Sequence, residues 1–182
     1  MSRSKSSTDA ATVIVGVDGS AGSMEALRWA LAEARLREAP LLVVHAWSYT
    51  YADGTGGGYS AMGGFGSFSA LGVDVGDLHR AAGELVQNAI DNVARGTEGV
   101  EIQRRVVQGN AADVLVDAAG PDDLLVVGSR GYGGFTGLLL GSVSQRCVHR
   151  AACPVVVVHA PNDAEGDHEV AHAAGGKSKA TV

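Results

Sequence analysis

The chain has 182 residues, a formal net charge of −6 and 46% hydrophobic residues, a balance typical of one globular domain that buries a core. The acidic charge and the lack of a basic stripe argue against nucleic acid as the main partner. No apolar run approaches membrane-spanning length, and residues 1–11 are polar rather than a secretory leader. We therefore expect a cytoplasmic protein that binds neither nucleic acid nor a membrane.

The first half of the chain alternates between strand and helix patterns. A short β-branched run stops at Asp18, and Asp18-Gly19-Ser20 predicts a turn with a helix cap. Continuous apolar runs are typical of strands buried on both faces of a parallel sheet, whereas apolar residues three and four apart indicate amphipathic helices. The predicted elements are strands over residues 12–17 and 41–47 and helices over residues 23–38 and 75–94.

The second half continues this alternation. In residues 100–107, apolar and polar residues alternate in part, which indicates an edge strand with one face in contact with water. The cysteines, Cys147 and Cys153, lack C-x-x-C spacing and are expected to be reduced, small core or surface residues. The predicted elements are strands over residues 100–107, 124–127 and 154–159 and helices over residues 143–150 and from 110 or 111 to 119.

Tails and one insertion are expected outside this core. A domain over residues 12–160 is predicted between a flexible N-terminal tail, residues 1–11, and a disordered C-terminal tail, residues 161–182. Residues 53–72 are dominated by Gly, Ser and aromatic residues and form a predicted glycine-rich insertion. A lid over the ligand is one interpretation of this insertion, and a mobile segment without a fixed role is the favoured one.

The order of elements predicts an α/β fold with a three-layer arrangement. An open parallel five-stranded sheet should carry helices on both faces. Ligands of such sheets sit at the carboxyl ends of the strands, where the strand order reverses. Two loops have suitable chemistry there, residues 16–20 after the first strand and residues 128–142 after the fourth. We therefore expect these two strands to be neighbours, with a crevice between them.

The loop after the fourth predicted strand has the composition of a phosphate cradle. Gly128 and Gly131 shape the turn, and Gly141 and Ser142 lead into the last helix. Glycine lets the main chain approach an anion closely, and a helix start offers free N–H groups and the positive end of its dipole. Taken singly, Gly128 and Gly131 are explained by an ordinary turn, and Ser142 by a plain N-cap. The occurrence of all of them together at the start of one helix favours an ATP site.

The pattern G-x-x-G-x9-G-[ST] resembles the nucleotide-binding motif of the universal stress protein family. The resemblance extends from Thr12 to His159. It is carried by three segments, residues 15–20, 128–131 and 138–144. It implies a Rossmann-like, adenine nucleotide alpha hydrolase-like sheet with strand order 3-2-1-4-5. It also implies an adenine nucleotide as the ligand, ATP with or without Mg²⁺.

The same resemblance implies roles for individual residues. Asp18 would lie beside the adenosine, the main chain of Ala46 would face the adenine, and Val127 would line the nucleoside. Residues of the glycine loop and of the following helix would surround the phosphates, with the hydroxyls of Ser142 and Ser144 as donors. The predicted nucleotide-binding set is Gly16, Asp18, Ala46, Val127, Gly128, Ser129, Arg130, Gly131, Tyr132, Gly133, Gly134, Gly141, Ser142, Val143 and Ser144.

Residues that are missing bear on the functional prediction. Every lysine lies in a tail, at Lys5, Lys177 and Lys179, so the domain has no P-loop or kinase-type phosphate lysine. No catalytic residue and no metal ligand is predicted. We therefore expect an ATP-binding regulatory module in stress response. The alternative function is a slow Mg²⁺-dependent ATPase or phosphotransferase that uses Asp18. For Asp18 itself, the alternative to a ligand contact is a plain turn-forming role.

The last predicted strand indicates a partner. Its four consecutive valines lie within residues 154–159, and an edge strand this apolar should not remain bare. The sequence therefore predicts a homodimer through this strand, as the family resemblance also implies.

Overall fold

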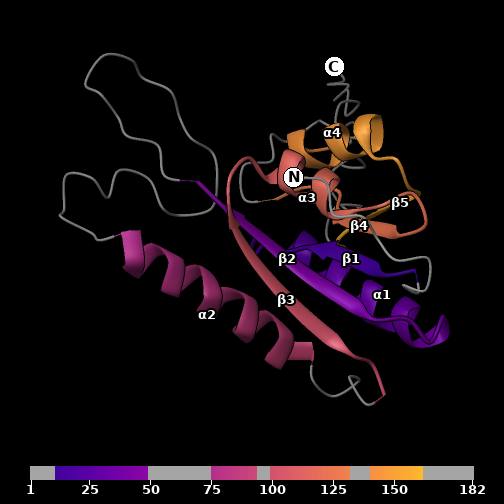
Figure 1. The fold of residues 1–182 in the computed structure, drawn as a ribbon, viewed down its shortest axis with the longest axis horizontal. Coiled ribbons are helices and arrows are strands. Elements are labelled where there is room, and N and C mark those ends of the chain that lie inside the picture. Colours follow the sequence, from indigo (N-terminus) through magenta and orange to yellow (C-terminus); the bar gives the residue numbers. More distant parts are fainter. Residues whose placement is uncertain (1–10, 49–74, 94–98, 132–139, 162–182) are drawn as a thin grey trace, which may run out of the picture.

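The computed structural model describes residues 11–48, 75–93, 99–131 and 140–161. Within them, five parallel strands form one sheet in the order β3-β2-β1-β4-β5, with helices on both faces (Figure 1). The predicted α/β fold and strand order are confirmed. The strands are β1 (Val13–Gly16), β2 (Leu41–Trp47), β3 (Ile102–Gln108), β4 (Leu124–Gly128) and β5 (Val155–Val158), and the helices are α1 (Ala21–Leu36), α2 (Val75–Val93), α3 (Ala111–Ala118) and α4 (Ser142–Arg150).

Two apolar clusters cover the two faces of the sheet. Alternate residues of a strand point to opposite faces, so Val15 of β1 packs with Leu27 of α1 and Val86 of α2. Its neighbour Ile14 packs on the other face with residues of α3 and α4, Leu115 among them. Because both faces are covered, β1 and β4 are apolar along their whole length rather than alternating.

The two edges of the sheet differ in character. β3 pairs only with β2, and Gln103 and Arg104 are exposed on it while Val106 packs against the core. The predicted edge position of this strand is therefore confirmed. At the opposite edge, β5 is half-buried along its four valines.

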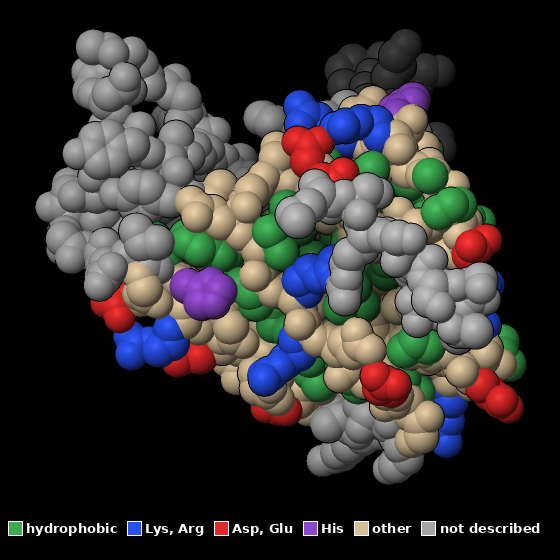
Figure 2. All heavy atoms as spheres, viewed as in Figure 1, with side chains coloured by type: hydrophobic (Ala, Val, Ile, Leu, Met, Phe, Trp, Pro, Cys, Tyr) green, Lys and Arg blue, Asp and Glu red, His purple; other side chains and the backbone are tan. Residues whose placement is uncertain are grey.

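On the face shown in Figure 2, acidic and basic side chains are interspersed rather than gathered into a patch of one sign.

The two cysteines belong to the core. Cys147 of α4 and Cys153 before β5 are free thiols, both buried in the second cluster. Burial raises the pKa of the Cys147 thiol to about 11, and the neighbouring Cys153 adds to the shift. Because the thiolate is the reactive form of cysteine, the structure gives Cys147 a packing role.

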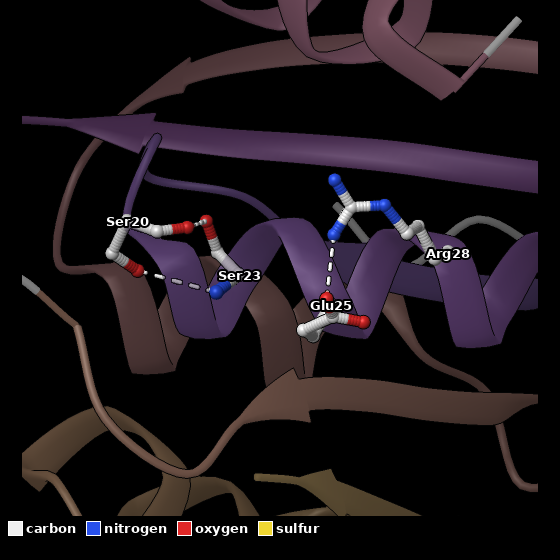
Figure 3. A network of polar contacts seen from close by, with 4 residues as sticks. All are labelled: Ser20, Ser23, Glu25 and Arg28. Carbon is white, nitrogen blue, oxygen red and sulfur yellow. Dashed lines mark hydrogen bonds and ion pairs between the residues drawn. The ribbon is translucent and has the colours of Figure 1, made fainter. Parts of the chain in front are cut away.

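A reciprocal serine pair starts α1, at Ala21 rather than at the predicted Ser23. The Ser23 N–H donates to the Ser20 side-chain oxygen at 3.2 Å, and the Ser23 hydroxyl donates to the Ser20 carbonyl at 3.0 Å (Figure 3). One turn further on, Glu25 and Arg28 form an exposed ion pair at 2.7 Å. The cap satisfies an otherwise unpaired first-turn amide and fixes the direction in which α1 leaves β1.

A buried carboxylate joins the amino ends of the two central strands. Asp123 is 3% exposed, and its two oxygens accept the N–H groups of Thr12 at 2.9 Å and Gly120 at 2.7 Å. The Leu124 N–H in turn donates to the Thr12 carbonyl at 3.0 Å. These contacts align β1 with β4 at the edge opposite the two glycine-containing loops.

Glu38 occupies a left-handed position where α1 ends. Its φ is +53°, and the following N–H, of Ala39, donates back to the Ala34 carbonyl at 2.9 Å. This arrangement favours glycine because a Cβ is strained there. We expect Glu38→Gly to raise the free energy of unfolding by about 1 kcal/mol, as measured by urea denaturation.

The same substitution inside a helix serves as the control. Glu84 is exposed in the middle of α2, and Glu84→Gly should lower the free energy of unfolding by about 0.5 kcal/mol. A loss of stability in both variants would contradict the cap geometry at Glu38.

Candidate nucleotide site

The loops after β1 and β4 meet at the carboxyl edge of the sheet. β1 and β4 are paired in parallel, so the segments that follow them emerge side by side. A Cβ at Gly131 would overlap the Oδ2 atom of Asp18, which places the carboxylate directly against the main chain of the glycine loop. The expected neighbourhood of the two loops is therefore present.

The start of α1 also packs against the glycine loop. A Cβ at Gly128 would lie 2.7 Å from the Gly22 carbonyl carbon and 3.0 Å from the Ser23 nitrogen. Real Cβ contacts with main chain are not this short, so Gly128 is required by the fold itself. Gly22 was not predicted as part of this region. The predicted helix began at Ser23, which left Gly22 outside it, whereas the structure places Gly22 in the first turn of α1.

Asp18 both forms the turn before α1 and lies at the candidate site. Its Oδ1 atom accepts the N–H of Ser20 at 2.9 Å and the hydroxyl of Ser20 at 2.6 Å. Its Oδ2 atom is the one that faces Gly131. The Asp18 side chain is held in one orientation, with one oxygen on the cap of α1 and the other beside the loop after β4.

His45 tethers the end of β1 just before Asp18. It is buried in β2, and its Nδ1 lies 2.7 Å from the carbonyl oxygen of Val17. A carbonyl only accepts, so Nδ1 carries the proton. His45 is therefore a buried histidine with a satisfied hydrogen bond.

The glycine loop is closed at its base by three residues, which we call the neck: Ser129, Gly141 and Ser144. The Ser129 carbonyl accepts the Gly141 N–H at 2.7 Å and the Ser144 hydroxyl at 3.0 Å. The same hydroxyl lies 2.9 Å from the Gly141 carbonyl. The Ser129 N–H donates to Val158 of β5 at 2.7 Å, so the neck is fixed to the sheet.

The helix that follows the neck begins without a side-chain cap. Its N-cap residue is Gly141, which has no side chain to cap the first amides. The first amide with an intrahelical partner is that of Gln145, which donates to the Gly141 carbonyl. By contrast, Ser20 caps α1, and Asn110 caps α3 by accepting the N–H groups at the start of that helix. Within the part of the chain that the structure describes, the amides of Ser142 to Ser144 therefore keep the donor capacity that an anion requires.

Two predicted contact residues have a different role in the structure. Ser129 is 0% exposed and Ser144 is 2% exposed, and the Ser144 hydroxyl donates to main-chain carbonyls. The expectation that this hydroxyl donates to phosphate does not fit this geometry, because a hydroxyl carries a single proton. Both residues build the neck, whereas Ser142 is exposed at the first position of α4.

The remaining predicted residues are spread over the sheet edge and the loop. Gly16 ends β1 and faces α3, since a Cβ there would meet the Leu115 side chain at 2.8 Å. Ala46 and Val127 are buried near the carboxyl ends of β2 and β4. Tyr132, Gly133 and Gly134 lie outside the described residues, as do the insertion and both tails except Ala11 and Pro161.

The surface of α4 is basic. Arg146 and His149 are exposed, and Arg150 forms an exposed ion pair with Asp113 of α3. Within the described ranges, no cluster of three or more His, Cys, Asp or Glu side chains is arranged to hold a metal ion. No helix in this part of the chain is long and apolar enough to span a membrane.

Comparisons with known proteins identify the relatives of this chain. A family model described as the Universal stress protein family matches residues 10–159. A universal stress protein of Mycolicibacterium smegmatis is 34% identical over 160 residues, covering 88% of this chain and 50% of that protein. One from Mycobacterium tuberculosis is 34% identical over 147 residues, covering 81% and 45%. The chain thus spans about half the length of the curated relatives it matches.

Solved structures share the fold. A universal stress protein in complex with cAMP is 28% identical, with a TM-score of 0.50 and coverage of 84% of this chain and 99% of that one. Universal stress protein UspA from Lactobacillus plantarum is 20% identical, with a TM-score of 0.61 and coverage of 81% and 97%. An Archaeoglobus fulgidus universal stress protein in complex with dAMP is 23% identical, with a TM-score of 0.52 and coverage of 83% and 99%.

A pair of glycine substitutions tests the packing at the site. Gly128→Ala should lower the free energy of unfolding by about 2 kcal/mol or more, because the main chain of α1 must move to make room. Gly83→Ala in α2 places its methyl where no described residue lies within 4 Å and should raise the free energy of unfolding by about 0.5–1 kcal/mol. Urea denaturation of both variants gives the comparison, and a neutral Gly128→Ala would show that α1 does not press on this loop.

Proposed function

The chain belongs to the universal stress protein family, and on that premise we propose that it is a regulatory module that binds ATP. In this proposal the phosphates bind to main-chain amides at the start of α4, and the adenosine lies at the carboxyl edge of the sheet. Its role in stress response would follow from changes in loop order and partner choice when the nucleotide binds.

The observation that carries this proposal is the uncapped start of α4. The amides of Ser142, Val143 and Ser144 precede the first intrahelical bond, and they follow a loop whose glycines fit the family motif. Each helix-terminal contact with an anion contributes only about 0.3–1 kcal/mol when exposed. Several amides that converge on one ligand are therefore needed, and the neck holds them in a fixed arrangement.

Solved relatives support an adenine nucleotide as the ligand class. The 28% identical structure was solved with cAMP, which shares the adenosine and one phosphate with ATP. ATP itself is our finer proposal, and it follows from the resemblance of the G-x-x-G-x9-G-[ST] pattern to the nucleotide-binding motif of the family. A micromolar site corresponds to about −8 kcal/mol and would stay occupied at millimolar nucleotide.

Roles follow for the other residues of the site. Asp18 is proposed to meet the adenosine, because its carboxylate sits at the meeting point of the two loops. Ala46 and Val127 are proposed to border the nucleoside from the ends of β2 and β4. Arg130 is the basic side chain at the entrance of the glycine loop, and it is proposed to lie beside the phosphates.

Phosphoryl transfer is the less favoured alternative. It requires charge neutralisation and a positioned nucleophile, and one oxygen of Asp18 is already occupied by Ser20. Steady release of ADP in the presence of Mg²⁺, abolished by Asp18→Asn, would replace the regulatory proposal with an enzymatic one.

The Gly141→Ala variant separates ligand binding from folding. Among the described residues, a Cβ at Gly141 has only ordinary contacts, the nearest at 3.4 Å, and the backbone φ of −73° suits alanine. The free energy of unfolding should change by less than about 0.5 kcal/mol, whereas the Kd for ATP should rise at least about tenfold because the methyl obstructs close approach to the amides.

Isothermal titration calorimetry measures this effect, with Gly83→Ala as the matched control. The control adds the same methyl group far from the site and should bind ATP like the parent chain. Equal ATP affinity in Gly141→Ala and in the parent chain would contradict binding at the start of α4, and no ATP binding by the parent chain would contradict the proposed function.

A homodimer through β5 is proposed as the state in which this module acts. The Pro154 and Val158 carbonyls accept hydrogen bonds from the β4 side, so the N–H of Val157 points to the open edge. We expect sedimentation to show a dimer at about 50 µM, a working concentration for ordinary dimers. Val157→Pro should weaken it without loss of β4 pairing, and a monomeric parent chain would contradict the proposal.

A further inference from the structure

We infer that the side chain of Ser144 has a positioning role at the nucleotide site: its hydroxyl sets the direction of the phosphate-binding amides through the neck and does not itself touch the nucleotide. This inference rests on the proposed function, in which ATP phosphates meet the start of α4. It assigns Ser144 a role distinct from that of Ser142, although both serines belong to the same helical turn.

The hydrogen bonds of Ser144 all lead to the main chain of the loop. Its hydroxyl lies 3.0 Å from the Ser129 carbonyl and 2.9 Å from the Gly141 carbonyl, and the residue is 2% exposed. Phosphate oxygens are acceptors, and the single proton of this hydroxyl is already shared between two carbonyls. A direct contact would require the phosphate to take that proton away from the neck.

The effect of these bonds is to lock the helix start against the end of β4. Ser129 is bonded to β5 through its N–H and to Gly141 through its carbonyl. Ser144 adds a second tie from α4 to the same carbonyl. Hydrogen bonds weaken steeply when donor and acceptor are misaligned, so amides held in a fixed direction bind phosphate better than amides on a helix end that can tilt.

Removal of the hydroxyl should leave the fold intact. In Ser144→Ala the Ser129 carbonyl still accepts the Gly141 N–H, and the Gly141 carbonyl still accepts the Gln145 N–H. No buried polar atom loses its only partner, which is the condition under which such a substitution is tolerated. The variant therefore tests the second tie rather than the whole loop.

The experiment combines ATP affinity with amide hydrogen exchange at Gly141 in the ligand-free protein. For Ser144→Ala we expect ATP to bind about fivefold more weakly, the effect of one modest hydrogen bond, and the Gly141 amide to exchange faster. Gln145→Ala, which changes an exposed side chain on the same helix, should alter neither quantity. Ser144→Cys, which keeps a weak donor of similar size, should restore part of both.

Each other result overturns a stated part of the account. Unchanged ATP affinity with faster exchange would make Ser144 a purely structural residue. Weaker ATP binding with unchanged exchange at Gly141 would make the Ser144 hydroxyl a direct contact of the nucleotide. Both outcomes end this inference and leave the proposed function standing, whereas failure of the parent chain to bind ATP would end the proposed function and the inference together.

Discussion

The parallel pairing of β1 with β4 is the constraint on which the rest of this structure depends. These strands are far apart in the sequence, and their pairing makes the loops that follow them neighbours at one edge of the sheet. Asp123 aligns the opposite ends of the same two strands by binding Thr12 and Gly120. The carboxylate of Asp18 and the main chain of Gly131 meet only because this alignment is kept.

Most of the architecture was predictable because buried parallel strands and amphipathic helices leave strong periodic signals. The neighbourhood of the first and fourth strands followed from chemistry, since two loops with ligand-binding character had to lie together at the carboxyl edge, whereas the full strand order came from the family resemblance. Element boundaries were less predictable. α1 begins two residues early because Ser20 and Ser23 cap each other, an interaction that depends on side-chain geometry rather than on composition.

The candidate site shows what a motif can and cannot specify. The motif marked Gly128, Gly131 and Gly141, but their reasons differ: the first makes room for α1, the second for Asp18, and the third has ordinary space around it. The two serines of the motif region also separate into an exposed Ser142 and a buried Ser144. Spacing alone does not distinguish these roles, because three-dimensional neighbours such as Gly22 decide them.

The central claim is that main-chain amides where β4 leads into α4 hold the polyphosphate without a lysine. The most direct measurement is amide hydrogen exchange of the chain with and without saturating ATP, resolved to single residues. The account predicts that ATP slows exchange at Ser142, Val143 and Ser144 more than in the middle of α2. Exchange at these three amides that is unaffected by saturating ATP would contradict it.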